Sequence, residues 1–229
     1  MRGKAIFWDF DGTLILPNES FLWAWEYGMN SCGYGVDAET LRLVLHASCT
    51  WYRPEESYEN ARGAAWWQAL FEKFEPFYSQ MKISREDGEK INERFREYIL
   101  DYRNYSVYED ARRTLEDCRA LGFRNYILSN NFPELPEVIE KLGLSQLLDG
   151  YVISSRVGYE KPRKEIFDTA VELAEHPEIC YMVGDNPVAD IQGARQAGMK
   201  TILVHGKPEQ AVRADFVCPS LGDIPGYLR

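Results

Sequence analysis

The sequence contains little histidine and cysteine and has no segment that suggests a disulfide framework or a zinc site. It has three histidines and five cysteines among 229 residues. The cysteines are odd in number and scattered without CxxC spacing, so we expect reduced structural thiols. The histidines form no recognisable ligand cluster in the sequence. These residues are Cys32, Cys49, Cys118, Cys180 and Cys218, and His46, His176 and His205.

Basic residues are outnumbered, which argues against polyanionic partners. Lys and Arg total 26 against 36 Asp and Glu, giving a formal net charge of −10. Such a chain is unsuited to binding nucleic acid polymers or anionic membranes. No hydrophobic run is long enough to span a bilayer, and the first predicted strand leaves no room for a signal peptide, so we expect a cytoplasmic location. Nothing indicates an obligate protein partner.

Two carboxylates follow the first predicted strand. The chain opens with MRGKAIFWDFDGTL, in which residues 5–8 are expected to form a short buried strand that ends before Asp9 and Asp11. Ligands bind at this edge of parallel α/β sheets. Two close carboxylates repel and separate in pKa, which suits one as an ionised nucleophile and the other as a proton carrier. Gly12 would let the backbone approach an oxyanion. Taken alone, a DxD pair is more typical of a solvated turn.

Two further polar elements lie in the C-terminal half of the sequence. Ser129 and Asn130 follow a predicted strand at 124–128, and Lys161 stands before Pro162 in GYEKPRKEIF. Pro162 suits the first turn of a following helix. Each element is uninformative by itself, since Lys161 could be a solvated surface residue.

A second pair of acidic residues, Asp185 and Asp190, lies just beyond another predicted strand, at 179–183. Each has an ordinary alternative, because Asp185 could cap a helix and Asp190 could be a first-turn helical carboxylate. With the first two carboxylates they would bring up to four negative charges together. A hard divalent cation such as Mg²⁺, with Lys161, would supply the positive charge that this site needs.

The four elements, in this order, resemble the signatures of the haloacid dehalogenase superfamily of phosphohydrolases, in its phosphatase branch. The resemblance covers the chain outside residues of about 15 to 105. It implies an α/β fold with a doubly wound parallel sheet and a Rossmann-like core. It also implies a two-step transfer through an aspartyl-phosphate, with Asp9 as nucleophile and Asp11 as general acid and base. Asp11 favours a phosphatase or phosphomutase over a dehalogenase, whose leaving group needs no such proton.

The same resemblance assigns the remaining site residues. Mg²⁺ would be held by Asp9, by the backbone carbonyl of Asp11 and by Asp185. Ser129 and Lys161 would stabilise the phosphoryl oxygens, with Asn130 beside them as a substrate contact. Asp190 would orient Lys161 or a metal-bound water without binding the metal itself.

Residues 15–105 show a different pattern from the rest. Apolar residues recur at helical spacing within 21–29, 67–78 and 91–102, Ser84 suits a helix start, and Pro76 should end or kink a helix. We expect residues 15–105 to form an α-helical cap domain of three to five helices, inserted into a core made of 1–14 and 106–229. This cap resembles the type 1 cap of the superfamily. In the core, we expect helices at 107–121, 162–175 and 188–197 and later strands at 151–153, 201–204 and near Phe216.

The leading hypothesis is a Mg²⁺-dependent phosphohydrolase acting on a small phosphorylated metabolite. A phosphomutase using the same residues and a non-catalytic binding or regulatory module are the alternatives. Arg53 and Arg62, in the stretch TWYRPEESYENAR, are candidates for contacting the leaving group, although solvent exposure would explain both. The tryptophans of this segment are expected to pack the helical bundle.

Overall fold

The computed structural model describes residues 3–49, 53, 55–206 and 214–228. Within these ranges the core is a six-stranded sheet of order β3-β2-β1-β4-β5-β6, and all neighbouring strands are parallel. The strands are β1 (Lys4–Trp8), β2 (Phe123–Ser129), β3 (Gly150–Ile153), β4 (Ile179–Gly184), β5 (Lys200–Val204) and β6 (Phe216–Cys218). Each strand predicted from the sequence is present, so the doubly wound α/β fold is confirmed.

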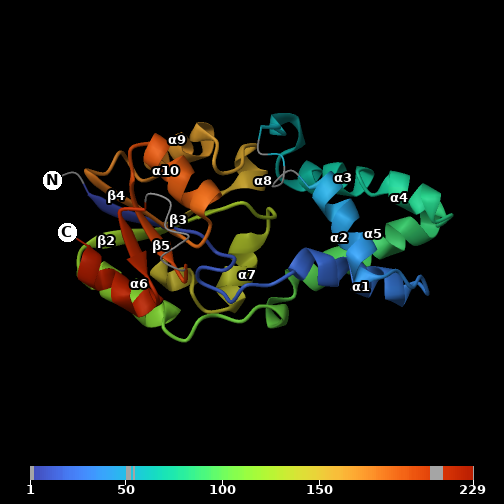
Figure 1. Ribbon diagram of the computed structural model, residues 1–229, viewed down its shortest axis with the longest axis horizontal. Coiled ribbons are helices and arrows are strands. Elements are labelled where there is room, and N and C mark those ends of the chain that lie inside the picture. Colours follow the sequence, from blue (N-terminus) through green and yellow to red (C-terminus); the bar gives the residue numbers. More distant parts are fainter. Residues whose placement is uncertain (1–2, 50–52, 54, 207–213, 229) are drawn as a thin grey trace.

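Helices cover both faces of the sheet, which explains why the strands are almost continuously apolar (Figure 1). In β1, Ala5 and Phe7 pack in one buried cluster with residues of α9 (Lys164–Leu173) and α10 (Gly193–Gln196). Ile6 and Trp8 pack on the opposite face with residues of α6 (Ala111–Ala120) and α7 (Leu135–Lys141). The short helix α8 (Ser154–Val157) follows β3, and 3-10 helices occupy Glu59–Ala61, Tyr102–Asn104, Ser145–Leu147 and Leu221–Tyr227.

Three core helices differ from their predicted bounds. The helix expected at 107–121 begins at Ala111, because the backbone N–H of Tyr108 bonds to the carbonyl of Leu14 and holds that stretch against the segment that follows β1. The helix expected at 188–197 is a π-helical segment, Pro187–Gln192, followed by α10. The prediction that Pro162 lies in a first helical turn is wrong, since α9 begins after Arg163 as its N-cap.

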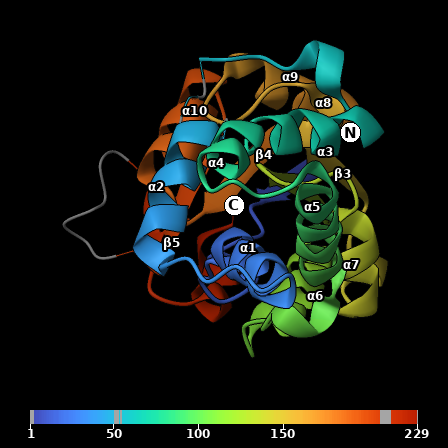
Figure 2. The same ribbon diagram turned by 90° about the vertical axis from the view of Figure 1, so that its right-hand side faces the viewer.

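The inserted segment between β1 and α6 forms a helical cap at one end of the sheet (Figure 1), and its helices lie in front of the core in Figure 2. Its five described α-helices are α1 (Ser20–Ser31), α2 (Ala38–Ser48), α3 (Ala64–Glu72), α4 (Glu75–Gln80) and α5 (Arg85–Leu100). Ser84 caps α5 by accepting the backbone N–H of Asp87, as its position predicted. The helical structure is interrupted between α3 and α4, and Pro76 lies in the first turn of α4.

Aromatic packing holds the cap together. Trp25 stacks on Phe74 with ring centroids 4.0 Å apart, and Trp66 and Trp67 are also buried. Trp23 is an exception, being exposed, and Trp51 lies outside the described residues. The predicted packing role therefore holds for three of the described tryptophans.

The cap contacts the core both at its linkers and beyond them. Two linkers join the cap to the core, one between β1 and α1 and the other between α5 and α6. They run side by side, with the N–H of Leu16 bonded to the carbonyl of Ser106 at 2.8 Å. Away from the linkers, Trp67 Nε1 donates to Glu134 Oε2 at 2.8 Å, and the N–H of Tyr58 donates to the carbonyl of Gly158 at 3.1 Å. The proposed domain limits of 1–14 with 106–229, and 15–105, stay a prediction. No helix in the described ranges has the length and apolar composition needed to cross a membrane.

Candidate active site

Three strand ends bring the candidate residues to one edge of the sheet. Trp8, the last residue of β1, pairs with Ile127 of β2 and Val183 of β4. The residues that follow these strands therefore emerge side by side. The site lies where the strand order reverses, between β1 and β4, which is the position where open α/β sheets bind ligands.

Lys161 is the buried cation of the site. Its Nζ donates to Asp9 Oδ1 at 2.8 Å and to Asp190 Oδ1 at 2.6 Å, and the residue is 2% exposed. Burial lowers the pKa of Lys161, but the attraction of Asp190 and Asp9 outweighs it and raises the pKa above its usual value. The lysine is therefore a fixed positive charge across the neutral pH range. The solvated-lysine alternative is excluded for Lys161.

Asp190 lies behind Lys161 and uses both of its oxygens. Oδ1 accepts from Lys161, and Oδ2 accepts the backbone N–H of Asn186 at 3.0 Å. Burial raises the pKa of Asp190, and the charge of Lys161 opposes that rise. The geometry suits a residue that orients the ammonium group, although Asp190 also lies in the first turn of the π-helical segment.

Asp185 faces Asp9 from the end of β4. The helix-cap alternative does not apply, because Asn186 caps the following segment by accepting the N–H groups of Val188 and Ala189. Asp185 Oδ1 instead accepts the hydroxyl of Thr13 at 3.3 Å. Burial and then the charge of Asp9 raise the pKa of Asp185 to about 6. The carboxylates of Asp9 and Asp185 therefore lie close together, and the positive charge of Lys161 does not fully offset their repulsion.

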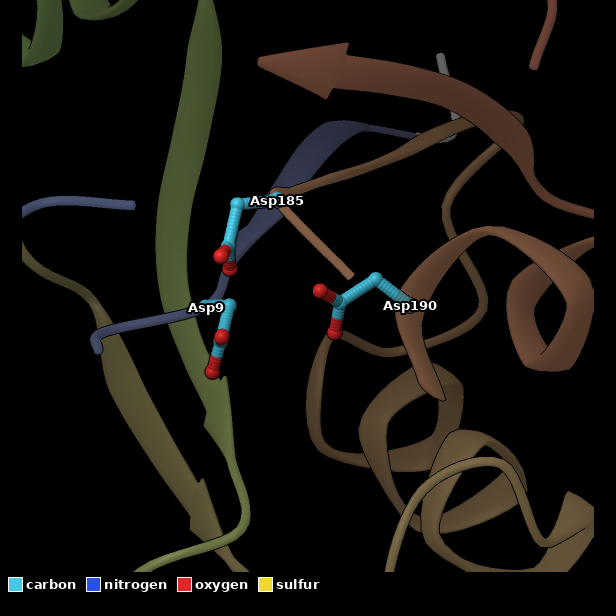
Figure 3. A group of neighbouring side chains, drawn as sticks. All are labelled: Asp9, Asp185 and Asp190. Atoms are coloured by element: carbon cyan, nitrogen blue, oxygen red, sulfur yellow. The ribbon is translucent and has the colours of Figure 1, made fainter. Parts of the chain in front are cut away.

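The acidic residues fit a hard divalent cation. Asp9, Asp185 and Asp190 each offer a carboxylate oxygen within 4.8 Å of the others (Figure 3). Asp190 is engaged by Lys161 and Asn186, which leaves the second oxygen of Asp9 and the carboxylate of Asp185 as the better donors. Oxygen donors of this kind suit Mg²⁺. A Cβ at position 12 would lie 2.5 Å from Asp185 Oδ2, so glycine there allows this carboxylate its place.

Asp11 lies beside Asp9 with a different environment. Burial and then the charge of Asp9 raise the pKa of Asp11 to about 6, although hydrogen bonds from Asn18 and Asn131 lower it. The two bonds are 3.1 Å and 2.5 Å long. A carboxyl group with this pKa exchanges protons readily near neutral pH. The two carboxylates of the first motif are therefore placed to differ in role.

Ser129 and Asn130 lie at the end of β2 but differ in their contacts. Ser129 is buried, lines the cavity above the carboxylates, and has its hydroxyl 3.4 Å from Asn131 Nδ2. The side chain of Asn130 bonds twice to the main chain of Lys161, accepting its N–H at 2.8 Å and donating to its carbonyl at 3.0 Å. Asn130 therefore holds the segment that carries Lys161. Its contact with substrate stays a prediction.

A cavity of about 460 Å³ joins the core site to the cap, a size that suits a small molecule. Its cap side includes Glu19, Arg42 and His46, none of which stood out in the sequence. Arg42 donates to Glu19 through two nitrogens, at 3.1 and 2.9 Å. Arg53, the predicted leaving-group contact, pairs with Glu56 and is not among the residues that line this cavity.

The stretch around Arg53 is described only in part. Residues 50–52 and Pro54 lie outside the described residues. Roles for Arg53 and Arg62 in binding the leaving group stay predictions. Thr13, Asn18 and Asn131 were not predicted as site residues, because single polar residues in loops carry no periodic signal in the sequence.

The chain is similar to known proteins in its sequence and in its fold. Residues 4–198 match the sequence model of the haloacid dehalogenase-like hydrolases. A mouse protein named haloacid dehalogenase-like hydrolase domain-containing protein 3 is 33% identical over 98% of this chain and 93% of its own. A phosphoserine phosphatase from Thermus thermophilus is 33% identical over 51% of this chain and 47% of its own. The crystal structure of the HAD-hydrolase YfnB from Bacillus subtilis, bound to magnesium, has a TM-score of 0.75 at 16% identity and covers 100% and 99% of the two chains.

Proposed function

The chain belongs to the haloacid dehalogenase-like hydrolase family, and on that premise we propose that it is a Mg²⁺-dependent phosphohydrolase acting on a small phosphorylated metabolite. The observation that carries the proposal is the contact of Lys161 with Asp9 beside Asp11, whose pKa is about 6. A nucleophile held by a fixed cation and a neighbouring proton donor are the two groups that phosphate-ester cleavage needs. The relative named as a phosphoserine phosphatase supports phosphate esters as the substrate class.

In the first step, a carboxylate oxygen of Asp9 attacks phosphorus in line with the ester oxygen. The new bond joins that oxygen to phosphorus, and the bond from phosphorus to the leaving alcohol oxygen breaks. Asp11, protonated, gives its proton to the departing oxygen. Lys161 and the hydroxyl of Ser129 stabilise the negative charge on the remaining phosphoryl oxygens.

In the second step, water attacks the phosphoryl group on Asp9. Asp11, now a carboxylate, takes a proton from that water, and the bond between the Asp9 oxygen and phosphorus breaks. Inorganic phosphate and the free carboxylate of Asp9 result. Asp190 holds the ammonium group of Lys161 in place through both steps.

Mg²⁺ would be held by Asp9, the backbone carbonyl of Asp11 and Asp185, where it would neutralise phosphate charge that Lys161 alone cannot balance. Two observations support this cation. The carboxylates of Asp9 and Asp185 lie close together, and the Bacillus subtilis YfnB structure, which has a similar fold, was determined with magnesium bound.

A screen of phosphorylated metabolites with Mg²⁺, reading both released phosphate and the organic product, tests the proposal. We expect stoichiometric release of phosphate, and loss of turnover when the metal is chelated or when Asp9→Asn is introduced. A fully active Asp9→Asn protein would contradict the mechanism. Conversion of substrate to an isomer without release of phosphate would instead identify a phosphomutase.

A further inference from the structure

The carboxylate of Asp11 accepts hydrogen bonds from two side-chain amides, one in the segment that leads into the cap and one in the core. Asn18 Nδ2 donates to Oδ1 at 3.1 Å, and Asn131 Nδ2 donates to Oδ2 at 2.5 Å. Asn131 follows β2 in the core and is 6% exposed. Asn18 lies in the linker between β1 and α1, which leads into the cap. One oxygen of Asp11 is therefore bonded to Asn131 of the core, and the other is bonded to Asn18 of the cap linker.

Each amide has its orientation fixed by a backbone N–H. The Oδ1 of Asn18 accepts from the N–H of Ser20 at 2.9 Å, and the Oδ1 of Asn131 accepts from the N–H of Phe132 at 3.1 Å. Turning either amide over would break that bond and set two acceptor oxygens against each other. The NH₂ groups of Asn18 and Asn131 thus face Asp11 as donors.

We propose that Asn131 and Asn18 are positioning residues that aim Asp11 at the leaving-group oxygen of the substrate. The inference rests on the proposed function, in which Asp11 protonates that oxygen. Each carboxyl oxygen has two lone-pair directions, and each amide occupies only one. Asp11 can therefore release its proton to the leaving oxygen as the phosphorus–oxygen bond breaks, and later accept one from water, without losing either amide contact.

Mispositioning Asp11 should slow a reaction in proportion to how much the leaving oxygen needs a proton. A para-nitrophenolate leaves readily without protonation, whereas a simple alkoxide does not. A change that only loosened the fold would slow both esters alike. The dependence of rate on leaving-group basicity therefore separates a positioning role from a structural one.

Asn130, the residue that precedes Asn131 in the chain, provides a matched control. Its amide bonds to the main chain of Lys161, on the phosphate side of the site. Removing that amide should disturb the stabilisation of the phosphoryl oxygens, which every phosphate ester shares. We expect Asn130→Ala to lower kcat/KM by a similar factor for all leaving groups.

The experiment compares kcat/KM for para-nitrophenyl, phenyl and simple alkyl phosphates, with Mg²⁺ present, in the unaltered protein and in five variants. The variants are Asp11→Asn, Asn131→Ala, Asn131→Leu, Asn18→Ala and Asn130→Ala. For Asn131→Ala we expect a loss of about 10- to 100-fold on alkyl phosphates and less than about 3-fold on para-nitrophenyl phosphate. Asn18→Ala should follow the same trend more weakly, because its contact is longer. Asn131→Leu fills the space without a donor and should match Asn131→Ala.

The outcomes separate the inference from the function on which it rests. A steep leaving-group dependence in Asp11→Asn, with flat or absent losses in both Asn131 variants, would overturn the inference and leave the proposed function standing. A flat response in Asp11→Asn itself would overturn the proton-donor role and the inference with it. A kcat/KM for para-nitrophenyl phosphate near the unaltered value shows that a variant is folded. Asn18→Ala tests the same role from the linker, independently of the Asn131 variants in the core.

Discussion

The ammonium group of Lys161 lies 2.8 Å from Oδ1 of Asp9, although 152 positions separate the two residues in the chain. Three parallel strands produce this contact indirectly, by bringing β1, β2 and β4 to one edge where the Lys161 segment is tied down by Asn130. Because these groups are largely buried, removing Lys161 would leave the carboxylates of Asp9 and Asp190 without their cation.

Replacing Lys161 tests how far the buried carboxylates depend on its positive charge. We expect Lys161→Met to lower kcat/KM by about 1000-fold or more, since phosphoryl charge and the Asp9 carboxylate both lose their fixed cation. In metal-free protein, the free energy of unfolding should fall by about 3 to 5 kcal/mol, the usual effect of breaking a buried pair. Enzyme assays and urea unfolding measure the two effects.

Lys164 offers the matched control. It is exposed and pairs with Asp168 on the surface of α9. Lys164→Met should change the free energy of unfolding by less than about 1 kcal/mol and leave turnover intact. Equal losses in the two variants would show that the buried contact has no special role.

Gly12 is predicted to be required for metal binding because of its neighbour. It has a φ of +72°, and an added Cβ would lie 2.5 Å from Asp185 Oδ2. Gly12→Ala should displace that carboxylate and weaken Mg²⁺ binding by about 10-fold or more, as measured by calorimetry.

Gly33 separates the steric effect from the backbone effect. Its φ is +82°, and a Cβ added at this position would have no neighbouring atom within 4 Å. Gly33→Ala should therefore cost about 1 kcal/mol of stability, as expected for a left-handed residue, without altering Mg²⁺ affinity. Unchanged affinity in Gly12→Ala would contradict the placement of Asp185 in the metal site.

The stability of metal-free protein should fall as the pH rises through about 6. The pKa values of Asp11 and Asp185 are each raised from 3.8 to about 6, mainly by burial and the charge of Asp9. The folded state thus binds more protons than the unfolded state between these values, and this stabilisation is lost as the carboxyls ionise. Mg²⁺ binds the ionised carboxylates and should oppose the loss.

Melting temperatures with and without Mg²⁺ measure this linkage. We expect the gain from Mg²⁺ to be larger near neutral pH than around pH 5, by about 2 °C or more. A gain that is independent of pH would mean that the converging carboxylates do not bind the ion.

The cap side of the cavity is predicted to influence substrate choice through Arg42. Arg42 lines the cavity beside Glu19, whereas Arg53 pairs with Glu56 outside it. Arg42→Ala should lower kcat/KM for the best metabolite found in the screen by about 10-fold, and change para-nitrophenyl phosphate hydrolysis little. Arg53→Ala is the comparison, and a larger selective loss there would restore the role predicted for it from the sequence.

The strands could be predicted because burial on both faces leaves nearly continuous apolar runs. Residues 5–8 mark β1, and the other strands follow from similar runs to within one or two residues. The helix ends were less certain, since tertiary contacts decide them. The bond from Tyr108 to Leu14, which delays the start of α6, has no local signal in the sequence.

The charged residues of the candidate site were predicted because they stand in the order of the family's signatures. Several carboxylates brought together also need positive charge, for which Lys161 was the best-placed candidate. Asn18 and Asn131 are uncharged and lie in loops, where asparagine is common. Only the folded chain shows that both amides meet Asp11.

The most direct test of the account is to trap the phosphoryl group on the protein. Acid quenching during turnover of a good substrate with Mg²⁺, followed by peptide mass spectrometry, should show one phosphoryl group on Asp9 and none in Asp9→Asn. A phosphoryl group on any other residue, or rapid turnover by the Asp9→Asn protein, would contradict the central claim.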